Sequence, residues 1–178
     1  MEYVRLGKSN LMISRVAMGA MSLSKIGDEE SAVALVRTAY QQGINFFDTS
    51  RNCEGCEKLL GDAVGDIRAS VVLASKTNGQ SGAEILSDLE TSLAVMHTDY
   101  IDLYQYETDC FLPEKDSPDG IYNAFLRMKE TGKIKAIGLA TQELDIAEKA
   151  IYSGLYDTIQ FPLSMLSADA SIALVKLC

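Results

Sequence analysis

Three charged side chains stand where predicted strands end. Asp48, Lys76 and Glu107 each close or directly follow a short, mostly apolar segment. If these strands run parallel, their carboxyl ends meet at one rim, and side chains on the same strand face converge there. A buried carboxylate–ammonium pair keeps both groups charged and sets up a local field, which would suit an active site. Asp48 and Lys76 could instead form a purely structural ion pair, and this alternative stays open.

Six strand-then-helix units must position these side chains. Strands are expected near residues 14–18, 44–48, 71–76, 100–106, 134–139 and 158–161, each followed by a helix, and the first dozen residues predict a β-hairpin. Short apolar strands that alternate with helices are typical of parallel βαβ units. Because such units close into a barrel at eight, the predicted fold is α/β, a partial (β/α)8 TIM barrel of six units plus the hairpin.

Local signals mark the ends of the expected helices. Asp28 and Ser81 are predicted N-caps, Gly43 is a predicted C-terminal stop, and Ser117–Pro118 predicts an N-cap followed by Pro at the first helical position. The competing architecture, an open doubly wound sheet, needs a glycine fingerprint after an early strand. The segment after the first strand does not fit that fingerprint, and Gly61 and Gly65 fall within a predicted helix.

Composition narrows the classes of function. The 178 residues carry a net charge of −9, and 47% of them are hydrophobic. An acidic surface disfavours nucleic acid as a partner. No apolar run is long enough for a membrane helix, and the first residues lack the apolar segment of a secretion signal, so a cytoplasmic location is expected.

Cys53 and Cys56 form a C-x-x-C motif just beyond the second predicted strand. In a chain without a secretion signal, the four cysteines are expected to be reduced thiols. The spacing also fits a redox pair or half of a metal site, and Cys110 could approach it on the same face of the barrel. No second C-x-x-C or nearby His completes a ligand set, so no metal is assigned and two loop cysteines are the plainer interpretation.

Five linked segments carry a family resemblance across the whole chain. They are Phe46-Phe47-Asp48-Thr49-Ser50, Leu73-Ala74-Ser75-Lys76-Thr77, Asp99-Tyr100-Ile101-Asp102-Leu103-Tyr104-Gln105, Gly132-Lys133-Ile134-Lys135-Ala136-Ile137-Gly138-Leu139 and Thr158-Ile159-Gln160-Phe161-Pro162. In order and spacing they resemble the aldo-keto reductases, NADPH-dependent (β/α)8 barrel enzymes, and most of all their bacterial barrel-only members. The resemblance implies that residues 1–178 form one incomplete barrel domain, truncated after the sixth β/α unit.

The resemblance also implies catalytic positions. In the family an Asp pairs with a Lys, the Lys lowers the pKa of a Tyr that protonates the carbonyl oxygen, and a His orients the carbonyl. Asp48 and Lys76 match the first two, whereas Cys53 stands at the Tyr position and Glu107 at the His position. A thiol beside Lys76 would tend to become a thiolate, which is a poorer proton donor. Steroid double-bond reductases of the family also carry Glu at the His position, but they keep the Tyr.

NADPH is the cofactor that the resemblance implies, with Thr141 and Gln160 as contacts to the nicotinamide carboxamide. The family has Ser-Asn where this chain has Ala140-Thr141. Its stacking aromatic and its basic phosphate-binding loop come from units seven and eight. We therefore expect weak binding of NADPH, because phosphate recognition relies on charge-assisted donors.

The expected function is that of an aldo-keto reductase-family oxidoreductase acting on a small carbonyl compound, impaired or inactive in this chain. Two alternatives stay open: a non-catalytic, decayed barrel, and a thiol- or metal-binding module that uses Cys53, Cys56 and Cys110. Open barrel edges also predict a homo-oligomer.

Overall fold

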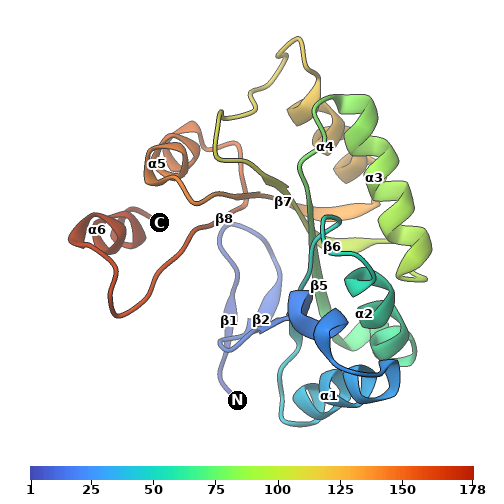
Figure 1. The fold of residues 1–178 in the computed structure, drawn as a ribbon. Helices are drawn as coiled ribbons and strands as arrows, with labels where there is room; N and C mark the ends of the chain where they lie inside the picture. The colour runs from blue at the N-terminus through green and yellow to red at the C-terminus, as the bar shows by residue number, and fades with distance from the viewer.

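A curled sheet of six parallel strands forms the centre of the molecule (Figure 1). The computed structural model describes residues 1–178. The strands follow one another in chain order: β3 (Met18–Gly19), β4 (Phe46–Asp48), β5 (Val72–Thr77), β6 (Ile101–Glu107), β7 (Ile134–Ala140) and β8 (Thr158–Gln160). The predicted α/β fold class is confirmed, and the sheet forms an open half-barrel.

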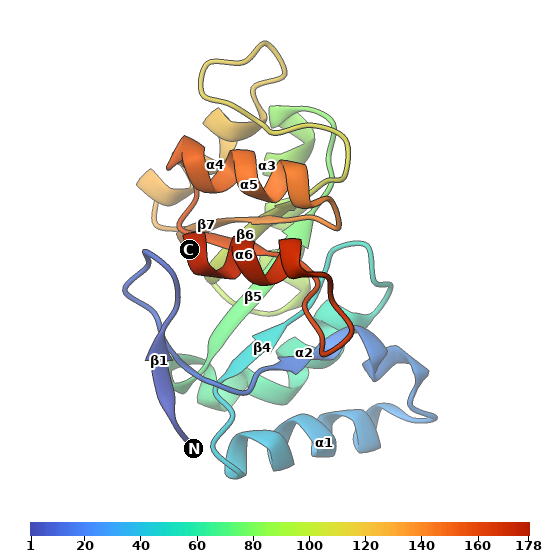
Figure 2. The same cartoon turned by 90° about the vertical axis from the view of Figure 1, so that its left-hand side faces the viewer.

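A helix follows each of these strands, and α1 to α5 pack on the outer side of the sheet. α5 lies beside β7 and β8, and α6 lies beside α5 (Figures 1 and 2). The helices are α1 (Glu29–Gln41), α2 (Cys56–Val64), α3 (Gly82–Val95), α4 (Ile121–Glu130), α5 (Leu144–Ser153) and α6 (Asp169–Leu177), with 3-10 segments η1 (Ala20–Lys25) and η2 (Gly65–Ser70). None of them combines the length and apolarity that a bilayer crossing requires.

Side-chain alternation along the strands divides the interior into two parts. On β6, Tyr104 belongs to the large apolar cluster of 29 buried residues shared by sheet and helices, whereas Leu103 belongs to a small cluster with Ala74 and Ala136. Since successive side chains of a strand point to opposite faces, the small cluster lies on the inner face of the half-barrel. Lys76 and Gln105 lie two residues beyond Ala74 and Leu103 on their strands, so their polar side chains stand on the same inner face, nearer the rim.

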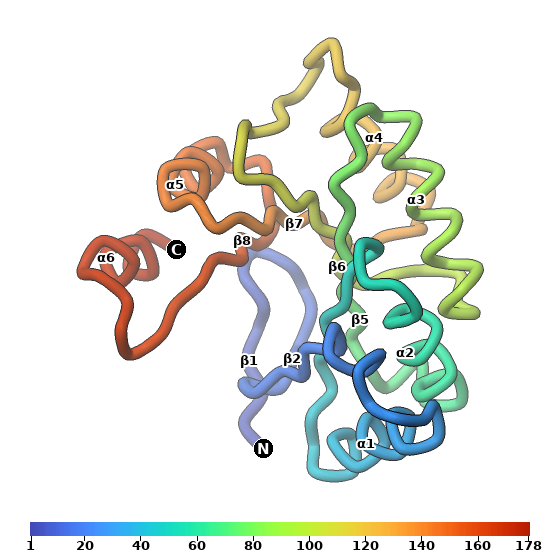
Figure 3. The backbone as a smooth tube through the Cα atoms, viewed as in Figure 1, coloured from blue at the N-terminus to red at the C-terminus, as the bar shows by residue number.

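The N-terminal hairpin of β1 (Tyr3–Arg5) and β2 (Met12–Ser14) covers the amino ends of the strands (Figure 3). The Asn45 side chain, just before β4, accepts a hydrogen bond from the Ser14 amide at 2.6 Å. At the other side, the Lys8 amide donates to the Asp157 carbonyl, just before β8, at 2.8 Å. The hairpin therefore leaves the carboxyl ends of the strands open for a site.

The helix-start signals had mixed outcomes. Asp28 and Ser81 are N-caps as predicted, because their side chains accept hydrogen bonds from the amides of residues 31 and 84. The predicted start at Ser117–Pro118 is wrong, because α4 begins at Ile121. The N-cap is Gly120, and the preceding Asp119 carboxylate accepts from the Ile121 amide at 2.7 Å, so Ser117 does not cap this helix. The first strand is also shorter than predicted, because Ser14 pairs with Tyr3 in the hairpin.

Gly61 lies in α2 at a close approach to the end of α3. A Cβ added at this position would lie 2.5 Å from the Met96 Cα and 2.7 Å from the Met96 carbonyl oxygen. Both atoms belong to the backbone, so the neighbour cannot move aside by changing a rotamer. Gly61, which is not part of a nucleotide-binding fingerprint, thus has a packing role.

Gly61→Ala should lower the free energy of unfolding by about 1–3 kcal/mol, because overpacking outweighs the better helix propensity of Ala. Gly65→Ala is the matched control, since Gly65 has right-handed helical dihedrals and nothing lies within 4 Å of its added Cβ. The control should be neutral or up to about 1 kcal/mol more stable. Urea unfolding measures both, and equal stability of the two variants would contradict the close contact.

Candidate active site

A cavity of about 380 Å³ opens at the carboxyl ends of the strands. Five of the six predicted site residues line it: Asp48, Lys76, Glu107, Thr141 and Gln160. The sheet register explains their meeting. Lys76 pairs with Gln105 on the next strand, and Ala140, which precedes Thr141, pairs with both Glu107 and Gln160. The rest of the wall consists of Met21, Asp109, Ala140, Gln142, Phe161 and Pro162.

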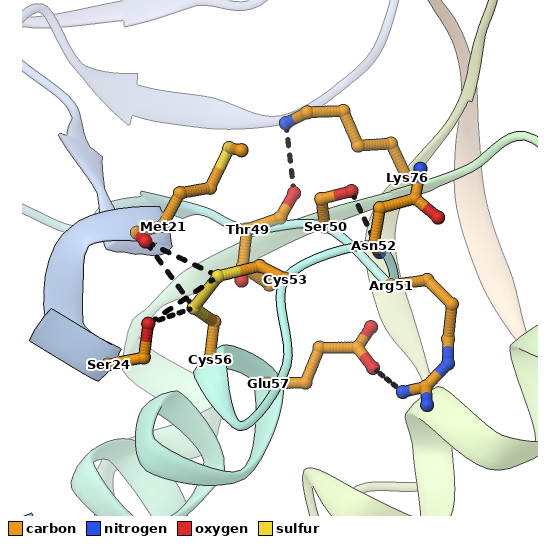
Figure 4. The surroundings of a disulfide bond; sticks show 10 residues. All are labelled: Met21, Ser24, Thr49, Ser50, Arg51, Asn52, Cys53, Cys56, Glu57 and Lys76. Carbon is orange, nitrogen blue, oxygen red and sulfur yellow. Dashed lines mark hydrogen bonds and ion pairs between the residues drawn. A yellow bond between two sulfur atoms is a disulfide. The ribbon is translucent and has the colours of Figure 1, made fainter.

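Lys76 and Asp48 form a close ion pair. The Lys76 Nζ lies 2.9 Å from Oδ1 and 2.7 Å from Oδ2 of Asp48, and it donates to the Thr49 carbonyl oxygen at 2.9 Å (Figure 4). The Lys76 side chain is 5% exposed and that of Asp48 is 15% exposed. An ammonium group has three N–H donors, so these three acceptors match its full capacity.

Two amide side chains extend this ion pair. The Gln160 Nε2 donates to the Asp48 Oδ2 at 3.3 Å, and the Gln105 Nε2 donates to the Gln160 Oε1 at 3.1 Å. The Gln105 Nε2 also lies 3.5 Å from the Asp48 Oδ1. Gln105 was not among the predicted site residues. Its place two residues before Glu107, on the same strand face, is the signal that could have identified it.

Glu107 and Thr141 both have partners at the rim. The Asn52 Nδ2, from the segment after β4, donates to the Glu107 Oε2 at 3.3 Å. The Thr141 hydroxyl donates to the Asp109 Oδ1 at 3.1 Å, and the Gln142 amide donates to the same oxygen at 2.6 Å. Sequence reasoning missed Asn52 and Asp109, because neither lies within a strand and no periodicity marks it.

The cavity wall is acidic. Asp48, Glu107 and Asp109 contribute carboxylates, and Lys76 contributes the only cation among the lining residues. With all four ionised, three negative charges and one positive charge leave a local net charge of −2. Since Lys76 is already paired with Asp48, the wall has no unpaired cation with which to attract an anion.

Cys53 is the predicted site residue that does not line the cavity. Its sulfur forms a disulfide with Cys56, which differs from the expectation of reduced thiols (Figure 4). The physical reason is the tight turn between them, which brings the two Cα atoms to 5.5 Å, within the range that a disulfide spans. Cys110 is unpaired and exposed, and no group of three or more His, Cys, Asp or Glu side chains is arranged to hold a metal ion.

The segment that carries Cys53 is held by a buried carboxylate. Glu57 is 2% exposed, accepts a hydrogen bond from the Ser75 hydroxyl at 2.7 Å and forms an ion pair with Arg51. These contacts attach the start of α2 to β5, next to Lys76. The burial of Glu57 is a property of the packed structure, and its local sequence does not mark it.

No tyrosine lines the cavity. On β6, Tyr104 and Tyr106 point to the outer face and pack in the large apolar cluster. Burial raises the pKa of the Tyr104 phenol, and burial likewise raises the pKa of Tyr106. Both phenols therefore stay protonated and remote from Lys76, and neither takes the place of the missing Tyr.

Comparison with known proteins identifies the family of this chain. Residues 15–178 match the model of the aldo/keto reductase family. The chain is 32% identical over 161 residues to the uncharacterised oxidoreductase YrpG of Bacillus subtilis, covering 78% of this chain and 48% of that protein. It is also 32% identical over 159 residues to the L-galactose dehydrogenase of Arabidopsis thaliana, covering 79% of this chain and 49% of that protein.

Solved structures share the fold. The holo form of the aldo-keto reductase AKR11C1 from Bacillus halodurans superposes with a TM-score of 0.84 at 26% identity, covering 99% of this chain and 63% of that one. The chain spans about half the length of the curated relatives it matches. The family model, which matches residues 15–178, shows that the chain belongs to the aldo/keto reductase family of oxidoreductases.

Proposed function

We propose that the rim cavity takes a small carbonyl compound next to the nicotinamide of NADPH, and that carbonyl reduction by this chain is strongly impaired. One observation supports the proposed impairment. Cys53, at the position that the resemblance gives to the catalytic Tyr, is bonded to Cys56 and lies outside the cavity wall. The proton donor that such a reduction needs is therefore absent from that position.

Reduction of a carbonyl needs a hydride and a proton. NADPH supplies the hydride when it is bound. A disulfide sulfur carries no proton, so Cys53 cannot protonate the carbonyl oxygen in this state. Lys76 does not replace it, because its three donors match the acceptors of Asp48 and Thr49, and loss of its proton would leave the Asp48 carboxylate without its counter-ion.

The cofactor contacts fit one end of NADPH better than the other. Gln160 supplies an amide at the cavity wall, which suits a carboxamide. The Thr141 hydroxyl donates to Asp109, and in that position it offers the cofactor an acceptor only. Phosphate groups need charge-assisted donors, and the sole cation of the wall is already paired. The Gln160 amide thus supports recognition of the nicotinamide end, whereas the acidic wall supports weak binding of NADPH overall.

Titration of the chain with NADPH tests this proposal directly. We expect no saturable change in cofactor fluorescence at micromolar concentrations and no carbonyl-dependent loss of NADPH absorbance with a panel of aldehydes and ketones. A full-length family member assayed in parallel shows that the panel and the assay work. Micromolar binding together with carbonyl-dependent oxidation would refute the proposed impairment.

A double-mutant cycle measures how strongly the structure depends on the Asp48–Lys76 pair. Lys76→Met and Asp48→Asn should each cost about 3–5 kcal/mol of unfolding free energy, because each leaves a buried group without its partner. The double variant should be more stable than the sum of the two losses predicts, by about 1 kcal/mol or more. Chemical denaturation provides all four stabilities.

Lys58→Met is the matched control for this cycle. Lys58 pairs with Asp62 on the surface of α2, where the two side chains are 50% and 34% exposed. Solvent screens such a pair, so the midpoint of unfolding should not change measurably. Additive losses at Asp48 and Lys76 would show that the two groups do not stabilise one another.

A further inference from the structure

We propose that Cys53 and Cys56 are a redox-active pair that undergoes thiol–disulfide exchange with dithiols at the mouth of the half-barrel. This inference does not rest on carbonyl reduction or on NADPH binding. It concerns a motif that the proposed function leaves unused, and it predicts different behaviour for the two cysteines of the pair.

The backbone of the turn keeps the two cysteines together without help from their sulfurs. The Cys53 amide donates to the Ser50 carbonyl at 3.1 Å, and the Cys56 amide donates to the Cys53 carbonyl at 3.2 Å. Neither hydrogen bond requires the sulfurs to be bonded. The turn can therefore keep the same shape when the pair is reduced, so that the disulfide can open and close again in the folded protein.

The two sulfurs differ in access. Cys53 is half-buried and can be reached by a small thiolate, whereas Cys56 is fully buried. Cys56 is also the first residue of α2, whose N-cap, Gly55, provides no side-chain hydrogen bond to the helix. A helix N-terminus stabilises a negative charge and lowers the pKa of a thiol placed there. Cys56 is thus suited to be the leaving group, and Cys53 to be the attacked sulfur.

Partners for the reduced form are already in place. The Met21 carbonyl oxygen lies 3.3 Å from the Cys53 sulfur and 3.5 Å from the Cys56 sulfur. The Ser24 hydroxyl oxygen lies 3.5 Å from the Cys56 sulfur (Figure 4). A Cys53 thiol can donate to the Met21 carbonyl, and the Ser24 hydroxyl can donate to a Cys56 thiolate. The nearby Glu57 carboxylate is paired with Arg51, which offsets its repulsion of that thiolate.

The exchange balances with a dithiol as the reductant. One thiolate of the dithiol attacks the Cys53 sulfur, the Cys53–Cys56 bond breaks, and Cys56 leaves as a thiolate. In the mixed disulfide, the reductant's first sulfur is bonded to Cys53. The reductant's second thiol then attacks that first sulfur and displaces Cys53 as a thiolate. The reductant is left as a disulfide, two electrons pass to the protein, and two protons end on Cys53 and Cys56. An oxidised dithiol reverses these steps.

A redox titration of the folded chain tests the exchange without any substitution. The protein is equilibrated in mixtures of reduced and oxidised dithiothreitol, quenched with acid and labelled with a maleimide, and mass spectrometry counts the labels. Of the four cysteines, only Cys110 and Cys178 should be labelled at the oxidised end. All four should be labelled at the reduced end, reversibly and without denaturant. Reduction that occurs only in denaturant would overturn the proposal, and so would thiols that stay reduced even in an excess of oxidised glutathione.

Single variants test the predicted roles of the two sulfurs. With oxidised glutathione, Cys56→Ser should trap a mixed disulfide on the accessible Cys53. Cys53→Ser should form one at least about tenfold more slowly, because Cys56 is buried. Cys110→Ser/Cys178→Ser is the control and should keep the titration of the pair unchanged. Equal trapping by the two single variants would overturn the assigned roles.

Discussion

The arrangement of the rim depends on one buried cation. The Lys76 ammonium is almost fully removed from water, and a charge in that position is tolerated only when it is paired and hydrogen-bonded. Asp48 supplies the counter-charge from the neighbouring strand, and the Thr49 carbonyl supplies a further acceptor. Gln105 and Gln160 then satisfy the outer side of the carboxylate. The ends of β4, β5, β6 and β8 are therefore linked through the Lys76–Asp48 ion pair.

The same requirement limits the chemistry of the rim. A Lys76 ammonium whose donors are all taken by Asp48 and Thr49 has a structural role. It becomes a catalytic group only when a proton donor stands beside it. In this chain the segment after β4 carries a disulfide instead of a proton donor, and that disulfide lies outside the cavity wall. The carboxylates of Glu107 and Asp109 make the wall acidic, so the family scaffold is kept while its electrostatic character differs from that of an anion-binding site.

Much of the fold could be predicted because its signals are local. Strand alternation and helix periodicity each need only a few neighbouring residues, and capping side chains such as Asp28 act within one turn. The predictions were wrong where a distant or competing partner decided the outcome. Ser14 pairs with Tyr3 in the hairpin, and α4 begins after Gly120, where the Asp119 carboxylate and not Ser117 accepts from the Ile121 amide.

The sequence by itself determined which side chains could share a strand face, and so predicted that Asp48, Lys76 and Glu107 meet at one rim, whereas Gln160 was expected there only from the family resemblance. Only the tertiary structure decided what each of them contacts. Gln160 reaches Asp48 across 112 positions of sequence, and Asn52 reaches Glu107 across 55. Such contacts depend on the register and curl of the whole sheet, to which every strand contributes. The spacing of Cys53 and Cys56 was visible from the start, whereas their place outside the cavity followed from how the turn before α2 packs against η1.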